Sequence, residues 1–92
     1  MKLQVTREST AIDVAMYSRP ACHLCDAAAD VIRSVQNQYE FEFRVVNIEN
    51  DIELESRYGR LIPVVEINGR PVFKYRVEKS ELEREIERLW NQ

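Results

Sequence analysis

The first half of the chain places three apolar patterns one after another. Residues 11–17 form a short, mostly apolar run that ends at Ser-Arg-Pro, as a buried parallel strand does. The next apolar side chains recur with the period of one helix face, at Leu24, Ala27, Ala28, Val31, Ile32 and Val35. Residues 39–45 alternate apolar with charged side chains, which is typical of a strand near a sheet edge. The sequence therefore predicts a β-α-β unit whose parallel strands are joined by a right-handed crossover.

The second half contains a strong hairpin signal at Asn68-Gly69. This dipeptide favours the left-handed backbone of a two-residue turn, and residues 64–67 and 72–75 on either side of it are mostly apolar. Two antiparallel strands are therefore expected. Pro71 has no N–H to donate to a neighbouring strand, so the second of these strands is expected at a sheet edge.

Two further helices are indicated by their ends. Asn50 followed three residues later by Glu53 predicts the start of a short helix, and Gly59 predicts its left-handed stop. Ser80 with Glu83 forms a capping-box pattern before the last helix. The apolar stripe of that helix would consist of Leu82, Ile86, Leu89 and Trp90. The predicted order of elements is thus β-α-β-α-β-β-α.

The length of the chain allows one domain with one core. It has 92 residues, of which 45% are hydrophobic and 32% charged, as in a small globular protein. Residues 1–10 are mainly polar without a clear period, so we expect an N-terminal arm or a short extra strand there. The folded domain is then expected over residues 11–92. Four aromatic residues are expected in its core: Tyr39, Phe41, Phe43 and Trp90.

Charge and hydropathy argue against two classes of partner. The net charge of −3 at pH 7 and the pI of about 5.2 give no basic surface for a nucleic acid. The 13 basic residues are scattered among 16 acidic ones, so attraction to a membrane surface is not indicated. No apolar run approaches the about 18 to 20 residues of a bilayer-spanning helix. Residues 1–10 have no apolar centre of a secretory signal, and a cytoplasmic location is the default expectation.

Both cysteines of the chain, Cys22 and Cys25, lie between the first strand and the first helix. Two sulfurs three residues apart at a helix start can close a disulfide with little backbone movement. The first sulfur lies beside unpaired backbone N–H groups and the positive end of the helix dipole, which stabilise a thiolate. In a reducing cytosol, one such pair is more often redox-active or metal-binding than a structural staple. The crossover places the pair at the carboxyl edge of the first strand.

Two separated motifs and the element order resemble a known family. The motifs are Tyr-Ser-Arg-Pro-Ala-Cys-His-Leu-Cys at 17–25 and Ile-Pro-Val-Val at 62–65, followed by the Asn68-Gly69 turn and the last helix. From about residue 11 to 90, the chain resembles glutaredoxin-like members of the thioredoxin superfamily. Its Cys-His-Leu-Cys form resembles their small glutaredoxin-like branch. The resemblance implies an α/β thioredoxin-like fold, with a four-stranded mixed sheet and helices on both faces. It also implies a cis-proline at Pro63 that faces the first cysteine.

The resemblance also implies a thiol–disulfide oxidoreductase that reduces protein disulfides or glutathione mixed disulfides. Cys22 would be the attacking thiolate, and Cys25 would resolve the mixed disulfide that forms. The backbone of Ile62, freed by Pro63, would pair with an extended substrate segment. A protonated His23 would stabilise the thiolate; the equally weighted alternative is a solvated residue in the first helical turn. For the two cysteines, the alternative is an inert structural pair.

Two segments depart from the pattern of typical glutaredoxins. That pattern has Cys-Pro-Tyr-Cys and, after the last strand, a Gly-Gly-x-Asp segment that holds glutathione, whereas residues 73–78 here are Phe-Lys-Tyr-Arg-Val-Glu. Arg19 does match the basic residue that binds a glutathione carboxylate. The electron donor therefore stays open between glutathione and a thioredoxin-reductase-type system, and no cofactor is required. The buried mid-strand carboxylate of thioredoxins is also missing, because the only acid of the first strand, Asp13, lies well upstream of the cysteines.

Two other functions are compatible with the same residues. The first is glutathione-assisted metal or iron–sulfur binding across a dimer. Zinc needs about four ligands, but Cys22, His23 and Cys25 lie too close in one turn to act together easily, and the chain has no other Cys or His. The second is a non-catalytic thioredoxin-like module whose groove near Pro63 binds a partner strand. We expect a monomer without a resident metal.

Overall fold

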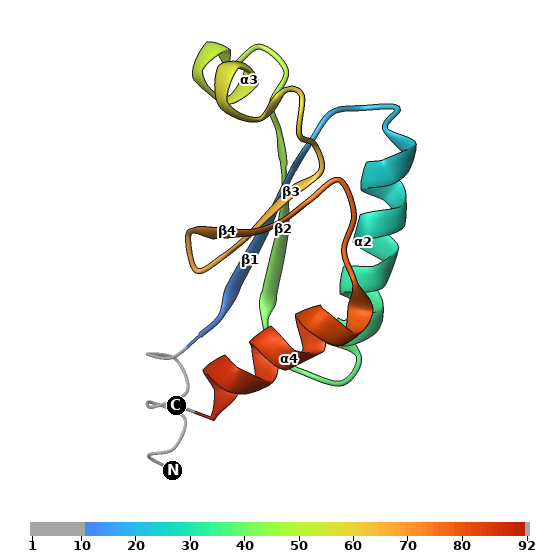
Figure 1. The fold of residues 1–92 in the computed structure, drawn as a ribbon, viewed down its shortest axis with the longest axis vertical. Coiled ribbons are helices and arrows are strands. Elements are labelled where there is room, and N and C mark those ends of the chain that lie inside the picture. Colours follow the sequence, from blue (N-terminus) through green and yellow to red (C-terminus); the bar gives the residue numbers. More distant parts are fainter. Residues whose placement is uncertain (1–10, 92) are drawn as a thin grey trace.

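The computed structural model describes residues 11–91, so the arm expected over residues 1–10 lies outside the described residues. The elements follow the predicted order β-α-β-α-β-β-α (Figure 1). They are β1 (Asp13–Ser18), α2 (His23–Gln36), β2 (Glu42–Asn47), α3 (Ile52–Tyr58), β3 (Val64–Ile67), β4 (Arg70–Lys74) and α4 (Lys79–Trp90). Within residues 11–91, none of the helices has both the length and the apolar character needed to cross a membrane.

The four strands form one mixed sheet in the order β2-β1-β3-β4. β1 and β2 are parallel, and Asp13 lies opposite Glu42. β1 and β3 are antiparallel, and Met16 lies opposite Val65. β4 is antiparallel to β3. The predicted β-α-β unit and the predicted hairpin are both confirmed. β2 and β4 lie at the two sheet edges, as the alternating pattern and Pro71 indicate.

The strands begin and end at slightly different residues from those predicted. The turn after α2 extends to Tyr39, whose N–H, like that of Gln38, donates to the carbonyl of Val35. Residues 39–41 are therefore not available to the sheet, and β2 begins at Glu42. The hairpin turn has a positive φ at both Asn68 and Gly69, as a two-residue turn requires, so β4 begins directly after it.

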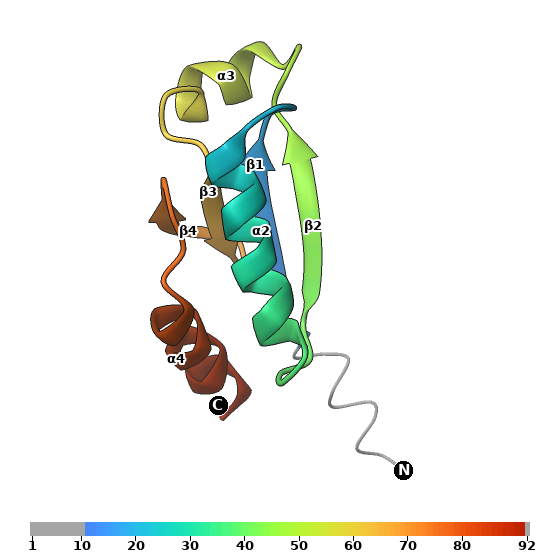
Figure 2. The same cartoon turned by 90° about the vertical axis from the view of Figure 1, so that its right-hand side faces the viewer.

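α2 and α4 cover one face of the sheet, and the hydrophobic core lies between these helices and the strands (Figures 1 and 2). Ile32 on α2, Leu82 and Ile86 on α4, and Val14 and Val65 on the strands are completely buried there. Burying a side chain of this size stabilises the fold by about 1.5–3 kcal/mol relative to leaving it exposed. Removal of apolar area from water on this face is therefore the main source of stability.

The buried stripe of α2 is rotated relative to the predicted one. Leu24 is 54% exposed and Ala27 is exposed, although the period placed both on the apolar face. Cys25 and Ala29 are buried instead, because the stripe that continues to Ile32 passes through them. Of the four aromatic residues expected in the core, Phe41 is buried, while three pack against its margin: Tyr39, Phe43 and Trp90.

The opposite face of the sheet is more polar and only partly covered. α3 lies at the end of the sheet where β1 and β2 stop (Figures 1 and 2). Its last residue, Tyr58, is buried beside Tyr17 of β1, with 4.9 Å between the ring centroids. Asp13 and Arg44, on β1 and β2, form an exposed ion pair on the same face. The predicted helix on the second face is thus α3, placed toward one end.

The predicted ends of α3 are confirmed only in part: Gly59 is the C-cap residue, but its conformation and the N-cap residue differ from those predicted. Asp51 is the N-cap, and its Oδ1 accepts a hydrogen bond from the N–H of Leu54 at 3.0 Å. Its neighbour Asn50 instead takes a left-handed φ of 67° in the preceding turn. Gly59 follows the helix with a right-handed φ of −55°, so it is not a left-handed stop.

The predicted capping box of α4 is also wrong. The helix begins at Lys79, with Glu78 as its N-cap residue, and no side chain caps it. Ser80 therefore lies inside the first turn, two positions after the N-cap residue. The expected apolar stripe is nevertheless present, since Leu82 and Ile86 are buried in the core.

Candidate active site

Cys22 and Cys25 are joined by a disulfide at the start of α2. Cys22 is the N-cap residue, and its sulfur accepts a hydrogen bond from the backbone N–H of Cys25 at 3.1 Å. Ala21, just before it, takes a left-handed φ of 59° where the chain turns from β1 into the helix. A sulfur thus occupies the position where most helices place the oxygen of Ser, Thr, Asp or Asn.

The two sulfurs lie in different environments. Cys25 is 3% exposed and belongs to the core, whereas Cys22 is only partly buried against it. A negative charge on Cys22 would be stabilised by the N–H of Cys25 and by the positive end of α2. Cys22 is therefore the sulfur that another molecule can reach, and Cys25 is one helical turn away on the buried side.

Ile62 and Pro63 are joined by a cis peptide bond, as the resemblance implies. Pro63 is buried directly before β3, and its carbonyl accepts a hydrogen bond from the N–H of Tyr75 at 2.9 Å. Ile62 lies in no helix or strand and is partly exposed. That Pro63 faces the first cysteine, and that the backbone of Ile62 receives a substrate, stay predictions.

His23 and Arg19 lie on opposite sides of Cys22 in the sequence, and the structure treats them differently. His23 is the first residue of α2 and its side chain is exposed, as in the solvated alternative. Arg19 is paired: its Nε donates to Oε2 of Glu55 at 3.1 Å and its Nη2 donates to Oε1 at 2.5 Å. These hydrogen bonds lower the pKa of the Glu55 carboxyl from its ordinary value and raise the pKa of Arg19.

A small pocket lies between α2 and the segment after β4, and neither cysteine lines it. Its volume is about 80 Å³. One wall includes Leu24, which stands between the two cysteines, and the other includes Tyr75, which has a left-handed φ of 72° and is 45% exposed. Residues 73–78, where typical glutaredoxins have paired glycines, thus contribute an aromatic residue to the wall of this pocket. The helical period did not reveal this, because it assigned Leu24 to the core.

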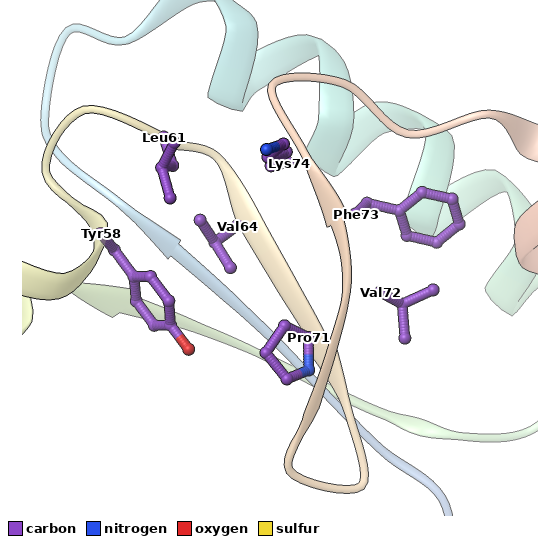
Figure 3. Close-up of a pocket in the computed structure, with 7 residues that line it drawn as sticks. All are labelled: Tyr58, Leu61, Val64, Pro71, Val72, Phe73 and Lys74. Atoms are coloured by element: carbon purple, nitrogen blue, oxygen red, sulfur yellow. The ribbon is translucent and has the colours of Figure 1, made fainter.

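A larger pocket of about 210 Å³ is on the β4 side of the sheet. Figure 3 shows it between Tyr58 at the end of α3, Val64 of β3 and Pro71 of β4. Neither cysteine lines it. Among residues 11–91 there is, in addition, no group of three or more His, Cys, Asp and Glu side chains arranged to hold a metal ion.

Sequence reasoning missed a buried carboxylate on β3. Glu66 is 9% exposed and accepts hydrogen bonds from the hydroxyls of Tyr17 at 3.1 Å and Tyr58 at 2.5 Å. Burial and, secondly, the hydrogen bond to Glu66 raise the pKa of both tyrosines above the ordinary value of 10.0. The available signal was an acid inside the otherwise apolar segment Val-Val-Glu-Ile. Its meaning depended on Tyr58 of α3, which only the fold places there.

Comparisons with known proteins agree with this geometry. The model of the glutaredoxin-like domain family (DUF836) matches residues 13–87. A curated glutaredoxin-like protein of Dictyostelium discoideum is 22% identical over 98 aligned positions, which cover 100% of this chain and 91% of that protein. A solved structure of a structural genomics target from X. campestris is 29% identical, with a TM-score of 0.70 over 82% of this chain and 96% of that one.

A thioredoxin from Halobacterium salinarum matches with a TM-score of 0.65 at 18% identity, over 95% of this chain and 81% of that one. At this identity the match concerns the fold alone, and it confirms the expected thioredoxin-like architecture. The family match together with the Cys22–Cys25 pair supports a redox-type function. Because the family model spans well over half of the sequence, the protein belongs to the glutaredoxin-like domain family.

Proposed function

We propose that the protein is a dithiol–disulfide oxidoreductase that reduces protein disulfides or mixed disulfides through Cys22 and Cys25. The observation that supports this best is the asymmetric pair itself. Cys22 caps α2 with a partly exposed sulfur, and Cys25 lies one turn inside, buried and close enough to form the disulfide. Membership in the glutaredoxin-like domain family does not specify a substrate or an electron donor, so both are part of the proposal.

In the reduced protein, the Cys22 thiolate attacks one sulfur of a substrate disulfide. A Cys22–substrate disulfide forms, and the other substrate sulfur leaves as a thiolate that takes a proton from water. Cys25 then loses its proton and attacks the Cys22 sulfur, which forms the internal disulfide and releases the second substrate thiol. Two electrons and two protons have then passed to the substrate. A thiol donor, glutathione or the dithiol of a reductase, returns them to the Cys22–Cys25 pair.

The positions of Cys22 and Cys25 favour a fast second step. A resolving thiol held three residues away is present at a high effective concentration, because no second molecule must be brought in. Burial of Cys25 also keeps bulky substrates from reacting with it directly. We further propose that an extended substrate segment pairs with the backbone of Ile62 beside Pro63, and that His23 adds positive charge near the thiolate when protonated.

The cysteine roles are tested by two serine variants. Cys22→Ser is expected to abolish turnover of a protein disulfide, whereas Cys25→Ser is expected to lose turnover but trap substrate on Cys22 as a mixed disulfide. Mass spectrometry after acid quenching identifies the trapped species. If a thiol reagent at pH 6 to 7 labelled Cys25 of the reduced protein before Cys22, the assignment would be reversed.

The electron donor is tested by measuring turnover side by side with glutathione and with a thioredoxin reductase system. Turnover with either one supports an oxidoreductase and identifies the donor. Absence of turnover with both, with the Cys22–Cys25 disulfide intact at the start, would contradict the proposal and favour a non-catalytic binding module.

A further inference from the structure

The arginine nearest to Cys22 in the sequence is already paired with a carboxylate of the same chain. Arg19 lies three residues before Cys22, in the connection from β1 to α2. Two of its guanidinium nitrogens, Nε and Nη2, donate to the two carboxylate oxygens of Glu55 on α3. This two-pronged arrangement is the one in which arginine binds a carboxylate most strongly. A carboxylate of another molecule that approaches Arg19 therefore meets a cation already paired with an internal carboxylate.

The charge of Arg19 is balanced by nearby carboxylates. Glu55 balances the charge of Arg19, and Glu49, in the segment before α3, adds a second negative charge near enough to act on Arg19. The Arg19 and Glu55 side chains are 36% and 35% exposed, so the pair lies at the surface where an incoming molecule senses it. A small anion near this loop is therefore attracted less strongly than it would be by an unpaired arginine.

Gly59 makes room for the pair. A Cβ atom at this position would lie 2.5 Å from the carbonyl oxygen of Glu55, 2.8 Å from its Oε1 and 3.1 Å from Nη2 of Arg19. Because Gly59 has an ordinary right-handed φ, its backbone conformation does not require glycine. The backbone carbonyl oxygen of Glu55 does, because it would lie closest to the added atom. The ends of the Glu55 and Arg19 side chains pass over the same position, so the pair lies against the end of α3 beside Gly59.

We propose that Glu55 is a specificity-determining residue that, by pairing with Arg19, disfavours anionic thiols and disulfides such as glutathione at the Cys22–Cys25 pair. Neutral thiols and neutral segments of protein disulfides do not meet this penalty. The proposal rests on the proposed function and narrows its substrate class. It assigns to α3 a role in choosing substrates, although α3 contributes neither of the reacting sulfurs.

The test compares two small thiols that differ mainly in charge, 3-mercaptopropionate and 2-mercaptoethanol, as reductants of the Cys22–Cys25 disulfide. The measured quantity is the ratio of the anionic to the neutral rate, from alkylation and mass spectrometry after timed quenching. At low ionic strength, Glu55→Gln is expected to raise this ratio by about three- to tenfold, because Arg19 becomes a free cation. Added salt is expected to reduce the gain.

Glu53→Gln is the matched control, since it removes the same charge from the same helix. Glu53 is 83% exposed on its side chain and lies 3.8 Å from Arg57, far looser than the Arg19 pair. It is expected to change the ratio by less than about twofold. Equal ratios in Glu55→Gln and Glu53→Gln would overturn the proposal, because the effect would then be one of net charge.

Arg19→Gln keeps the test decisive if Glu55→Gln folds poorly. With Arg19 absent, Glu55 is an unpaired anion, and the ratio is expected to fall below that of the wild type; an unchanged ratio would overturn the proposal. In the double variant Arg19→Gln/Glu55→Gln, the gain of the single Glu55 variant is expected to disappear.

Turnover of a protein disulfide by the wild type is measured in parallel. Its absence would contradict the proposed function, whereas turnover with an unchanged ratio in Glu55→Gln would contradict this inference alone.

Discussion

The two faces of the sheet stabilise the same four strands by different interactions. Toward α2 and α4 the side chains are apolar and completely buried, and their contribution grows with the area removed from water. On the opposite face, the carboxylate of Glu66 accepts hydrogen bonds from Tyr17 of β1 and Tyr58 of α3. The polar face contributes less to the free energy of folding, but it fixes the position of α3. The hydrogen bond from Tyr58 to Glu66 holds α3, and with it Glu55, against β3. The main stabilisation of the fold and the placement of α3 are thus assigned to different faces.

The largest expected effect comes from the apolar face. Ile32→Ala is expected to lower the free energy of unfolding by about 2–5 kcal/mol, because Ile32 is 0% exposed and its loss leaves a cavity. Ile52→Ala on α3 is the matched control, since Ile52 is 87% exposed, and is expected to change stability by no more than about 0.5 kcal/mol. Urea unfolding measures both. Similar losses in the two variants would contradict the assignment of stability to this face.

The polar face is expected to give an intermediate effect. Glu66→Leu is expected to cost about 1–3 kcal/mol, because the hydroxyls of Tyr17 and Tyr58 lose their acceptor. Glu66→Gln should cost less, since its amide oxygen still accepts one of these hydrogen bonds. Unfolding by urea again provides the measurement. If the leucine variant were as stable as the wild type, the hydrogen bonds of this face would not contribute, and the two faces would differ only in burial.

The smallest effect is expected from removing one hydroxyl. Tyr58→Phe keeps the ring but loses the hydrogen bond to Glu66, which is expected to cost about 0.5–1.5 kcal/mol near neutral pH. Tyr39→Phe is the comparison, because Tyr39 donates to Glu87 over the same 2.5 Å but in an exposed position. Its loss is expected to be smaller, since water replaces the missing partner. Equal losses would show that burial of the hydrogen bond does not matter.

The Tyr58 variant also has a pH dependence whose sign follows from its raised pKa. Burial, and then the hydrogen bond to Glu66, hold the folded-state pKa of Tyr58 above the ordinary 10.0. A raised pKa means that the folded state retains the proton longer, so the stabilisation is complete below pH 10 and is lost as pH rises through the folded-state pKa. The stability gap between wild type and Tyr58→Phe should be constant from pH 6 to 9 and shrink above pH 10. A gap that widens there has the wrong sign for this explanation.

Local patterns predicted most of the fold because they act through neighbours in sequence. The Asn68-Gly69 dipeptide specified its turn through its own backbone preferences. The helix caps were harder, because Asn50 and Asp51 are both good cap residues and local preference does not choose between them. The fold chose Asp51 by placing Asn50 in a left-handed turn. Leu24 was misassigned for a related reason, since a helical period gives a stripe but not the direction in which the stripe faces.

The sequence by itself determined the position of the cysteine pair: two cysteines three residues apart after an apolar strand pattern and before an apolar helix pattern place a sulfur at a helix start. This depends on spacing and on backbone geometry within a few residues. Only the tertiary structure decided which polar side chains pair across the fold. Arg19 meets Glu55 across 36 residues, and Tyr17 meets Glu66 across 49. Side chains so far apart in the chain become neighbours only when α3 and β3 are packed against β1, and no local rule contains that information.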